Sequence, residues 1–210
     1  MNIEYRTLSD PLENRGLLFV VSAPSGAGKT SLCRELIDRF DNLRHSVSFT
    51  TRKIRAGEVE GVDYHFVDQS TFTDMIEQNH LAEWAEVHGN HYGTSLQTLE
   101  QAAREGVDLL LDIDCQGAAQ LKKNYPGGIF VFILPPSFSE LERRLRGRET
   151  DTEEVIDRRL KNSQQEIAEA SKYDYQVVND KFDVALKQLC AIIVAEHCRT
   201  ERIQSDMKIT

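Results

Sequence analysis

The sequence has few of the features that mark secreted, membrane or zinc-stapled proteins. Its cysteines are only four, at positions 33, 115, 190 and 198. None of them forms a Cys-x-x-Cys pair or has zinc-finger spacing. The longest apolar runs, 17–21 and 129–134, are far shorter than the roughly 20 residues that cross a bilayer. Residues 1–15 contain no apolar run of signal-peptide type, so we expect a cytoplasmic protein with reduced cysteines and no membrane partner.

Basic charge is not in excess either. Lys and Arg number 25 against 34 Asp and Glu, which makes the formal net charge −9. A general nucleic-acid binder needs a basic footprint, so we expect no nucleic-acid partner. His88 and His91 have no further metal-binding residues beside them. With 40% hydrophobic and 28% charged residues, the 210-residue chain has the composition of an ordinary globular domain.

Short apolar runs alternate with amphipathic segments along most of the chain. Strands are predicted at 17–22, 107–112, 129–134 and 175–178. Helices are predicted at 29–40, 117–123, 139–146, 153–170 and 182–197. Ser139 is the expected N-cap of the third helix. Strands separated by helices favour an α/β fold, with a mainly parallel sheet and helices on both of its faces.

Two regions break this alternation. Residues 46–93 are rich in Thr, Arg, Gly, Tyr and His, and they predict short strands, turns and a small helix at 70–79. Residues 147–154 are polar and lie between two predicted helices, which indicates a mobile loop. We therefore expect a single domain with a core, an inserted α+β lobe and a mobile lid. The expected core spans 16–46, 95–145 and 161–204, the lobe about 47–94, and the lid about 146–160.

The strongest motif is a phosphate loop that follows the first predicted strand. It consists of Ala23, Pro24, Ser25, Gly26, Ala27, Gly28, Lys29 and Thr30. The motif matches G-x-x-x-x-G-K-[ST] except at Ala23, which matters only if that position needs a positive φ. Backbone N–H groups of such a loop converge on phosphate oxygens, Lys29 reaches the β- and γ-phosphates, and Thr30 holds Mg²⁺. The alternative is a glycine-rich turn with an exposed lysine.

Two aspartates, Asp112 and Asp114, stand at the end of the strand predicted over 107–112. Residues two apart on a strand point to the same face. Ligands of open α/β sheets lie beyond the carboxyl ends of the strands, so these aspartates should share the rim of the phosphate loop. There they could hold metal-bound water or orient basic side chains. The alternative is that they cap the helix predicted from Gly117.

Arginines form two further groups. Arg52 and Arg55, with Tyr64 and Tyr92, could enclose one phosphate through bidentate hydrogen bonds, although alone they could equally be surface residues of a small sheet. Residues 140–161 hold seven basic and seven acidic side chains, so they could be a salt-bridged surface. Arginines on a hinged loop are also what a phosphoryl-transfer site needs to close over its charge.

Taken in this order, the motifs resemble the guanylate kinase family from about Gly16 to the C-terminal helix. The resemblance rests on seven blocks: SAPSGAGKT, SVSFTTRKIRAGEVEGVDYHFV, EWAEVHGNHYGTS, LDIDCQG, ILPPS, LERRLRGRETDTEEVIDRRL and VVND. It implies a phosphate-loop core, a GMP-binding lobe and a lid that closes over ATP. The implied reaction transfers the γ-phosphoryl group of ATP to GMP, giving ADP and GDP, with Mg²⁺ as cofactor.

The resemblance also implies roles for individual residues. The implied ATP site is the phosphate loop with Asn179, and Thr30 holds Mg²⁺ with Asp112 acting through water. The implied GMP site comprises Ser48, Arg52, Arg55, Tyr64, Glu83, Tyr92, Thr94 and Asp114. The implied catalytic residues are Lys29, Arg52, Arg144, Arg148 and Arg159.

The chemistry of guanine agrees with this assignment. Guanine offers N1–H and N2–H₂ donors, which a carboxylate such as Glu83 can accept together, while Ser48 can donate to O6. Adenine would leave that carboxylate unpaired, and such a site can reject the wrong base by about 10⁴-fold.

This sequence departs from the family pattern at Ala23, Ile54, Cys115 and Glu149, and none of these changes removes a side chain that the chemistry needs. Two alternatives stay open. The first is a silent binding module of the same fold, although such modules typically have eroded phosphate loops. The second is a kinase for AMP or a pyrimidine nucleotide, which Glu83 and Ser48 argue against. The sequence leaves the oligomeric state open.

Overall fold

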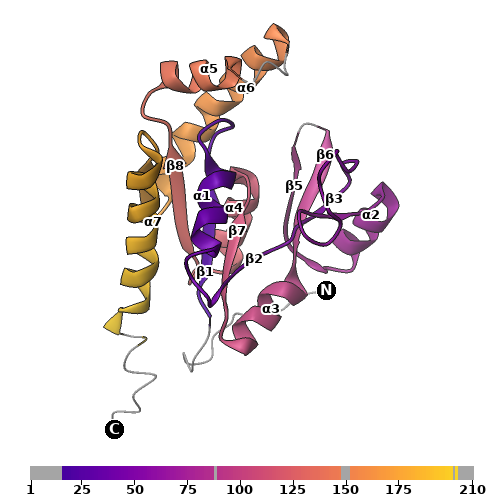
Figure 1. Cartoon of the computed structure of the whole chain (residues 1–210). Helices are drawn as coiled ribbons and strands as arrows, with labels where there is room; N and C mark the ends of the chain where they lie inside the picture. The colour runs from indigo at the N-terminus through magenta and orange to yellow at the C-terminus, as the bar shows by residue number, and fades with distance from the viewer. Residues whose placement is uncertain (1–15, 88, 148–151, 201, 203–210) are drawn as a thin grey trace.

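A five-stranded parallel sheet forms the centre of the computed structural model, which describes residues 16–87, 89–147, 152–200 and 202 (Figure 1). Its order is β2-β7-β1-β8-β9. The strands in that order are β2 Leu43–His45, β7 Asp108–Asp112, β1 Leu18–Ser22, β8 Ile129–Leu134 and β9 Tyr175–Val178. Every neighbouring pair is parallel. The predicted parallel sheet is therefore confirmed, and the short edge strand β2 is an addition to it.

Helices cover both faces of this sheet because its strands are apolar on both sides. Phe19 and Val21 face the core that α1 (Lys29–Ile37) and α7 (Phe182–His197) complete. Val20 faces the opposite core, completed by α3 (Leu96–Glu105) and α4 (Cys115–Asn124). This alternation is the pleat of a doubly covered strand. The prediction of helices on both faces is confirmed.

A second sheet lies beside the first and is built from residues that the sequence analysis assigned to an inserted lobe (Figure 1). Its order is β4-β3-β6-β5. The elements are β3 Phe49–Thr50, β4 His65–Phe66, α2 Gln69–Glu77, β5 Leu81–Val87 and β6 Asn90–Ser95. We call residues 47–94 the small-sheet region. Its edge strand β5 packs against α4 of the central sheet, so the two sheets meet there.

Above the carboxyl ends of the parallel strands lie α5 (Phe138–Arg146) and α6 (Glu153–Ala168) (Figure 1). A 3₁₀ turn, η1 (Glu169–Lys172), follows α6. Leu141 and Leu145 of α5 pack on Ile156 of α6 in a small apolar cluster of their own. This pair of helices overhangs the phosphate loop.

Two sequence predictions about helices were wrong. The N-cap of α5 is Ser137 and not Ser139, because the Ser137 hydroxyl accepts the Glu140 N–H at 3.1 Å in an S-x-x-E capping arrangement. Helix α3 was not predicted at all, since its few apolar residues are surrounded by Gln, Glu and Arg. Its signals are Ser95, which caps the Thr98 N–H, and Gly106, which ends the helix in the left-handed conformation. In the described part of the chain, no helix is long and apolar enough to cross a membrane.

Candidate functional site

The phosphate loop joins β1 to α1 and depends on two of its glycines. Gly26 and Gly28 have φ of 94° and 92°, a region that residues with a Cβ rarely adopt. A Cβ on Gly28 would also lie 2.4 Å from Asn179 Nδ2. Ala23 has no positive φ, since Asn79 is the one non-glycine residue in the described part that does. Alanine at the first motif position therefore introduces no backbone strain.

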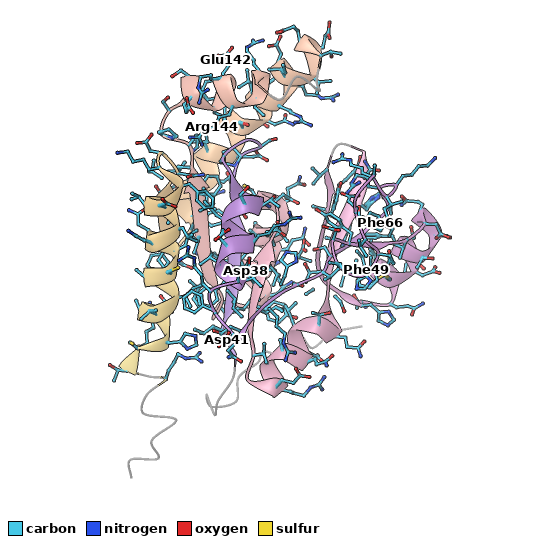
Figure 2. All side chains as sticks on the ribbon, in the orientation of Figure 1. Asp38, Asp41, Phe49, Phe66, Glu142 and Arg144 are labelled. Carbon is cyan, nitrogen blue, oxygen red and sulfur yellow. The ribbon has the colours of Figure 1, made fainter. Side chains whose placement is uncertain are left out.

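Asn179 supports the phosphate loop through a hydrogen bond to the loop backbone. Its Nδ2 donates to the Ala27 carbonyl at 2.7 Å, and only 6% of the residue is exposed. The Asn179 carbonyl in turn accepts from Arg144 Nη2 at 3.1 Å, and Arg144 Nε donates to Glu140 at 2.8 Å. Arg144, whose side chain on α5 is labelled in Figure 2, thus connects α5 to the segment between β9 and α7. The amide group of Asn179, implied by the resemblance to belong to the ATP site, donates to the loop backbone in this structure.

Lys29 begins α1 and points toward the end of β7. Its ammonium group donates to the Ile113 carbonyl at 3.3 Å. Asp112, which ends β7, lies 2.9 Å from His45 Nε2. Burial would raise the pKa of Asp112, but the positive charge of Lys29 and the His45 hydrogen bond outweigh it, so the pKa lies below its usual value. A charged carboxylate therefore sits beside the phosphate loop.

The residues at the start of α1 fit a magnesium ion bound together with phosphates. Thr30 is exposed in the first turn of α1. Asp112 ends a strand that pairs directly with β1, Val21 lying opposite Asp112. Mg²⁺ is usually held by one or two protein oxygens plus substrate phosphates, and a hydroxyl with a nearby carboxylate meets that need. Over the described residues, no three His, Cys, Asp or Glu side chains gather as a metal-ligand group.

Asp114 acts as a helix cap in this structure. Its Oδ1 accepts the backbone N–H of Gln116 at 2.6 Å and that of Gly117 at 3.3 Å. The capping alternative raised from the sequence is therefore confirmed for Asp114. Burial raises the pKa of Glu83 on β5, and the negative charge of Asp114 adds to that rise.

Arg52 is held by a carboxylate and by aromatic rings. Its Nη2 and Nη1 donate to the two carboxylate oxygens of Glu58 at 2.7 and 3.0 Å. Its guanidinium carbon lies 5.3 Å from the ring centre of Tyr64. The hydrogen bonds that Arg52 donates to Glu58 raise the pKa of Arg52 and lower that of Glu58. Arg52 is thus oriented and charged, but already paired.

The other members of this group lie around Arg52. Tyr92 packs edge-on against Tyr64, with ring centres 5.9 Å apart. Arg55 is exposed on the same loop, and its backbone N–H donates to Glu58 at 2.8 Å. Burial, followed by the charge of Asp112, raises the pKa of Tyr64 to about 12. Asp112 ends β7 of the central sheet, so its charge acts across to the ring that lies beside Arg52.

Glu83 is the most deeply buried carboxylate of the small-sheet region and is 3% exposed. Its Oε1 accepts the hydroxyl of Thr94 at 2.5 Å. Burial raises the pKa of Glu83 to about 7, with Asp114 adding to the rise and Thr94 and Lys29 opposing it. Ser48 is half-buried on the same sheet, where its carbonyl accepts the His65 N–H at 2.9 Å. The structure therefore brings Glu83 and Thr94 together, within the electrostatic reach of Lys29.

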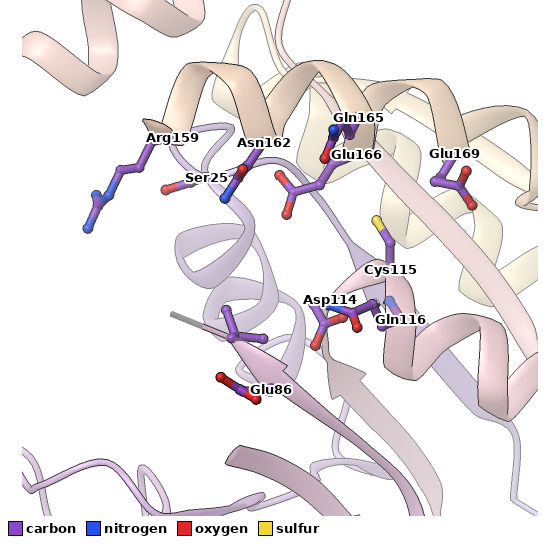
Figure 3. Close-up of a pocket in the computed structure, with 11 residues that line it drawn as sticks. Ser25, Glu86, Asp114, Cys115, Gln116, Arg159, Asn162, Gln165, Glu166 and Glu169 are labelled. Atoms are coloured by element: carbon purple, nitrogen blue, oxygen red, sulfur yellow. Dashed lines mark hydrogen bonds between the residues drawn. The ribbon is translucent and has the colours of Figure 1, made fainter. Parts of the chain in front are cut away.

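A cavity of about 450 Å³ lies between α6, the start of α4 and the end of β5 (Figure 3). Ser25 of the phosphate loop opens onto it, and Arg159, Asn162 and Glu166 reach into it from α6. Arg159, one of the implied catalytic residues, therefore lines this cavity. Arg148, the remaining predicted arginine, and Glu149 lie outside the described residues.

Glu166 is a cavity residue that the sequence analysis missed. Burial, and then the charge of Asp114, raises its pKa to about 7. Its spacing could have revealed it, because Glu166 follows Arg159 by seven residues and so lies on the same face of α6 two turns later.

Comparisons with known proteins agree with one another. A family model described as guanylate kinase matches residues 15–196. The guanylate kinase of Syntrophotalea carbinolica is 60% identical over 195 residues, which is 93% of each chain. That of Geobacter metallireducens is 55% identical over 192 residues, or 91% of this chain and 95% of the relative. The crystal structure of guanylate kinase from Anaplasma phagocytophilum superposes with a TM-score of 0.76 at 35% identity, covering 91% of both chains.

Proposed function

The chain belongs to the guanylate kinase family, and we propose that its phosphate loop binds ATP while the small-sheet region binds GMP. The reaction is transfer of the γ-phosphoryl group of ATP to GMP, giving ADP and GDP, which makes the chain a nucleoside monophosphate kinase. The observation that carries this division of labour is geometric. Ser25 of the phosphate loop and Glu86 and Val87 of β5 in the small-sheet region line one cavity.

On the donor side, backbone N–H groups of residues 23–30 and the N-terminus of α1 bind the phosphates of ATP. Lys29 neutralises the β- and γ-phosphates, and Asn179 keeps the loop in its binding shape through Ala27. Thr30 would hold Mg²⁺, with Asp112 accepting from metal-bound water. When bound, Mg²⁺ neutralises the charge that develops on the transferred phosphoryl group.

On the acceptor side, Glu83 accepts from the N1–H and N2–H₂ donors of guanine, while Ser48 donates to O6. Thr94 orients the carboxylate of Glu83, and Asp114 lies beside it. Arg52, Arg55, Tyr64 and Tyr92 bind the GMP phosphate. Arg52 has to turn from Glu58 toward that phosphate or share itself between the two.

The transfer step asks mainly for positioning and charge neutralisation. The attacking group is a phosphate oxygen that is already largely deprotonated near neutral pH, so no strong general base is needed. Lys29, Arg52, Arg144 and Arg159 neutralise the transferred charge, with Arg148 joining them by its family position. Residues 47–94 and about 146–160 would close over the two nucleotides, as the expected lobe and lid, and we expect the chain to work in the cytoplasm.

A silent binding module is the less favoured function. It would need no working phosphate loop, whereas this loop keeps both left-handed glycines, Lys29 and the supporting hydrogen bond from Asn179.

The base-reading role is tested by measuring ADP release with ATP and each of GMP, dGMP, AMP, CMP and UMP. We expect turnover with GMP well above that with AMP or the pyrimidine nucleotides. Glu83→Gln should lower kcat/KM for GMP by about 100-fold or more and leave residual AMP use almost unchanged, because the amide cannot accept from both guanine donors. Glu77→Gln, an exposed carboxylate on α2, is the matched control. Equal losses with GMP and AMP would contradict base reading by Glu83.

A further inference from the structure

Helix α4 holds the edge strand of the small sheet through a side-chain amide. Gln120 Nε2 donates to the Trp84 carbonyl at 2.6 Å, and the Trp84 N–H donates to Gln120 Oε1 at 3.2 Å. The amide group therefore makes the pair of hydrogen bonds that a neighbouring strand would make. This attachment lies one residue after Glu83, so it ties the backbone beside the carboxylate to the central sheet.

One turn earlier on α4, a glycine makes room for the carboxylate itself. A Cβ on Gly117 would lie 2.2 Å from Glu83 Oε2 and 2.9 Å from Glu83 Cδ. Gly117 is not among the glycines with positive φ, so the backbone conformation does not require it. Glycine is also a poor helix former. Its presence within a helix is explained by the close approach of Glu83.

The carboxylate of Glu83 is thus defined from two sides. Thr94 holds Oε1 at 2.5 Å, and Oε2 occupies the gap that Gly117 leaves on the surface of α4. Glu83 is 3% exposed, so protein atoms enclose its carboxylate on nearly every side. The burial that raises the pKa of Glu83 is consistent with this tight enclosure.

We propose that Gly117 and Gln120 are positioning residues for base selection, which set the Glu83 carboxylate where it accepts both the N1–H and N2–H₂ donors of guanine. The inference rests on the base-reading role of Glu83 given under the proposed function. Neither residue needs to touch the nucleotide. Gln120 holds β5 at a fixed distance from α4. The missing side chain of Gly117 leaves space for the Glu83 carboxylate between the two elements.

A methyl group at position 117 has a predictable consequence. Ordinary contacts leave more than 3 Å between a Cβ and an oxygen, so Oε2 would have to move by roughly 1 Å. The displaced atom is the end of a flexible side chain, and alanine favours the helix, so the fold should persist. Because Gln120 holds β5 in place, the carboxylate rather than the strand has to move.

The test compares GMP with IMP, which lacks the 2-amino group of guanine. Gly117→Ala should weaken GMP binding by about 100-fold, because both charge-assisted hydrogen bonds from guanine to the Glu83 carboxylate would be distorted. IMP binding should weaken much less, so the ratio of the two dissociation constants should fall toward one. Dissociation constants come from competition calorimetry without ATP, and the KM for ATP should stay within about twofold. Gly127→Ala is the matched control, because a Cβ there meets nothing within 4 Å.

A second variant covers the other contact. Gln120→Ala should weaken GMP binding by about tenfold and reduce the GMP-to-IMP preference in the same sense, with the exposed Lys123→Ala as the control on α4. Thermal melting confirms that each variant is folded. If Gly117→Ala and Gln120→Ala keep the preference of the unmodified chain while Glu83→Gln loses it, the positioning role is wrong and the proposed function stands. If Glu83→Gln also keeps it, base reading by Glu83 fails and the positioning role falls with it.

Discussion

The donor and acceptor sites of this kinase are built by different means. The proposed donor site consists mainly of the eight consecutive residues of the phosphate loop, whose binding groups are backbone N–H groups shaped by Gly26 and Gly28. The proposed acceptor site collects side chains from positions 48 to 114 of the sequence, carried by the second sheet and the start of α4. The first is a local structure, whereas the second exists only after the chain has folded.

The two sites also differ in what ligand binding has to replace. The backbone of the phosphate loop is already supported by the hydrogen bond from Asn179 to the Ala27 carbonyl. In the acceptor site, Arg52 is paired with Glu58 and Glu83 with Thr94. A nucleotide must take over or share these hydrogen bonds, and the acceptor site therefore depends on side-chain geometry and protonation. The donor site depends on one lysine and on the shape of the backbone.

The largest expected effect is a loss of turnover from a change in the proposed donor site alone. Lys29→Ala should lower turnover by about 10³-fold, because it removes the positive charge that faces the transferred phosphoryl group. GMP affinity should stay within about twofold at pH 8.5, where Glu83 stays ionised without the opposing charge of Lys29 and the acceptor groups are untouched. Steady-state ADP release and GMP calorimetry check the two statements, with Lys187→Ala on α7 as the control. Turnover that survives in Lys29→Ala would remove the donor role from the phosphate loop.

A smaller effect, on the KM for GMP, is expected from a change at Arg52 in the proposed acceptor site. Arg52→Lys keeps the charge but cannot form two parallel hydrogen bonds or stack on Tyr64 in the same way. Losing one charge-assisted hydrogen bond of about 2 kcal/mol should raise the KM for GMP by roughly thirtyfold. The KM for ATP should not change. Arg39→Lys, an exposed residue in the turn that follows α1, is the control, and a parallel rise in both KM values would contradict separate sites.

The smallest expected effect is a pH dependence of binding that the acceptor site should show and the donor site should lack. Glu83 has a pKa of about 7 in the free protein and must be ionised to accept from guanine. GMP binding should therefore weaken as the pH falls below 7, by up to about tenfold per pH unit, and should level off above it. ATP binding at the loop should lack this contribution, which calorimetry from pH 5.5 to 8.5 can show.

Other groups titrate in the same interval and need a control. Glu166 has a pKa of about 7, and the GMP phosphate loses its second proton with a pKa of roughly 6. Glu83→Gln retains both, so subtracting its pH profile isolates the contribution of Glu83. If the two profiles run parallel below pH 7, Glu83 is not the group that couples GMP binding to protons.

Sequence patterns predicted most of the central sheet because its strands are continuous apolar runs. The bounds of β8 and β9 agree with the predicted 129–134 and 175–178, and α7 with 182–197. Helix α3 was missed because its buried side is narrow, with Leu99 and Ala102 as its buried residues. The cap of α5 was misplaced because two serines stand close together and only the folded turn selects Ser137.

The phosphate loop could be predicted from the amino-acid sequence alone. Its glycines and Lys29 act through local backbone geometry, which neighbouring residues specify. The sequence also indicated which residue types could bind a nucleotide phosphate and a guanine ring. Three contacts could be seen only in the folded structure. Arg52 pairs with Glu58, Asn179 supports the loop, and Gly117 leaves space for the Glu83 carboxylate. These contacts join residues whose separation in the chain carries no periodic signal, because burial and close packing, not local conformational preference, bring them together.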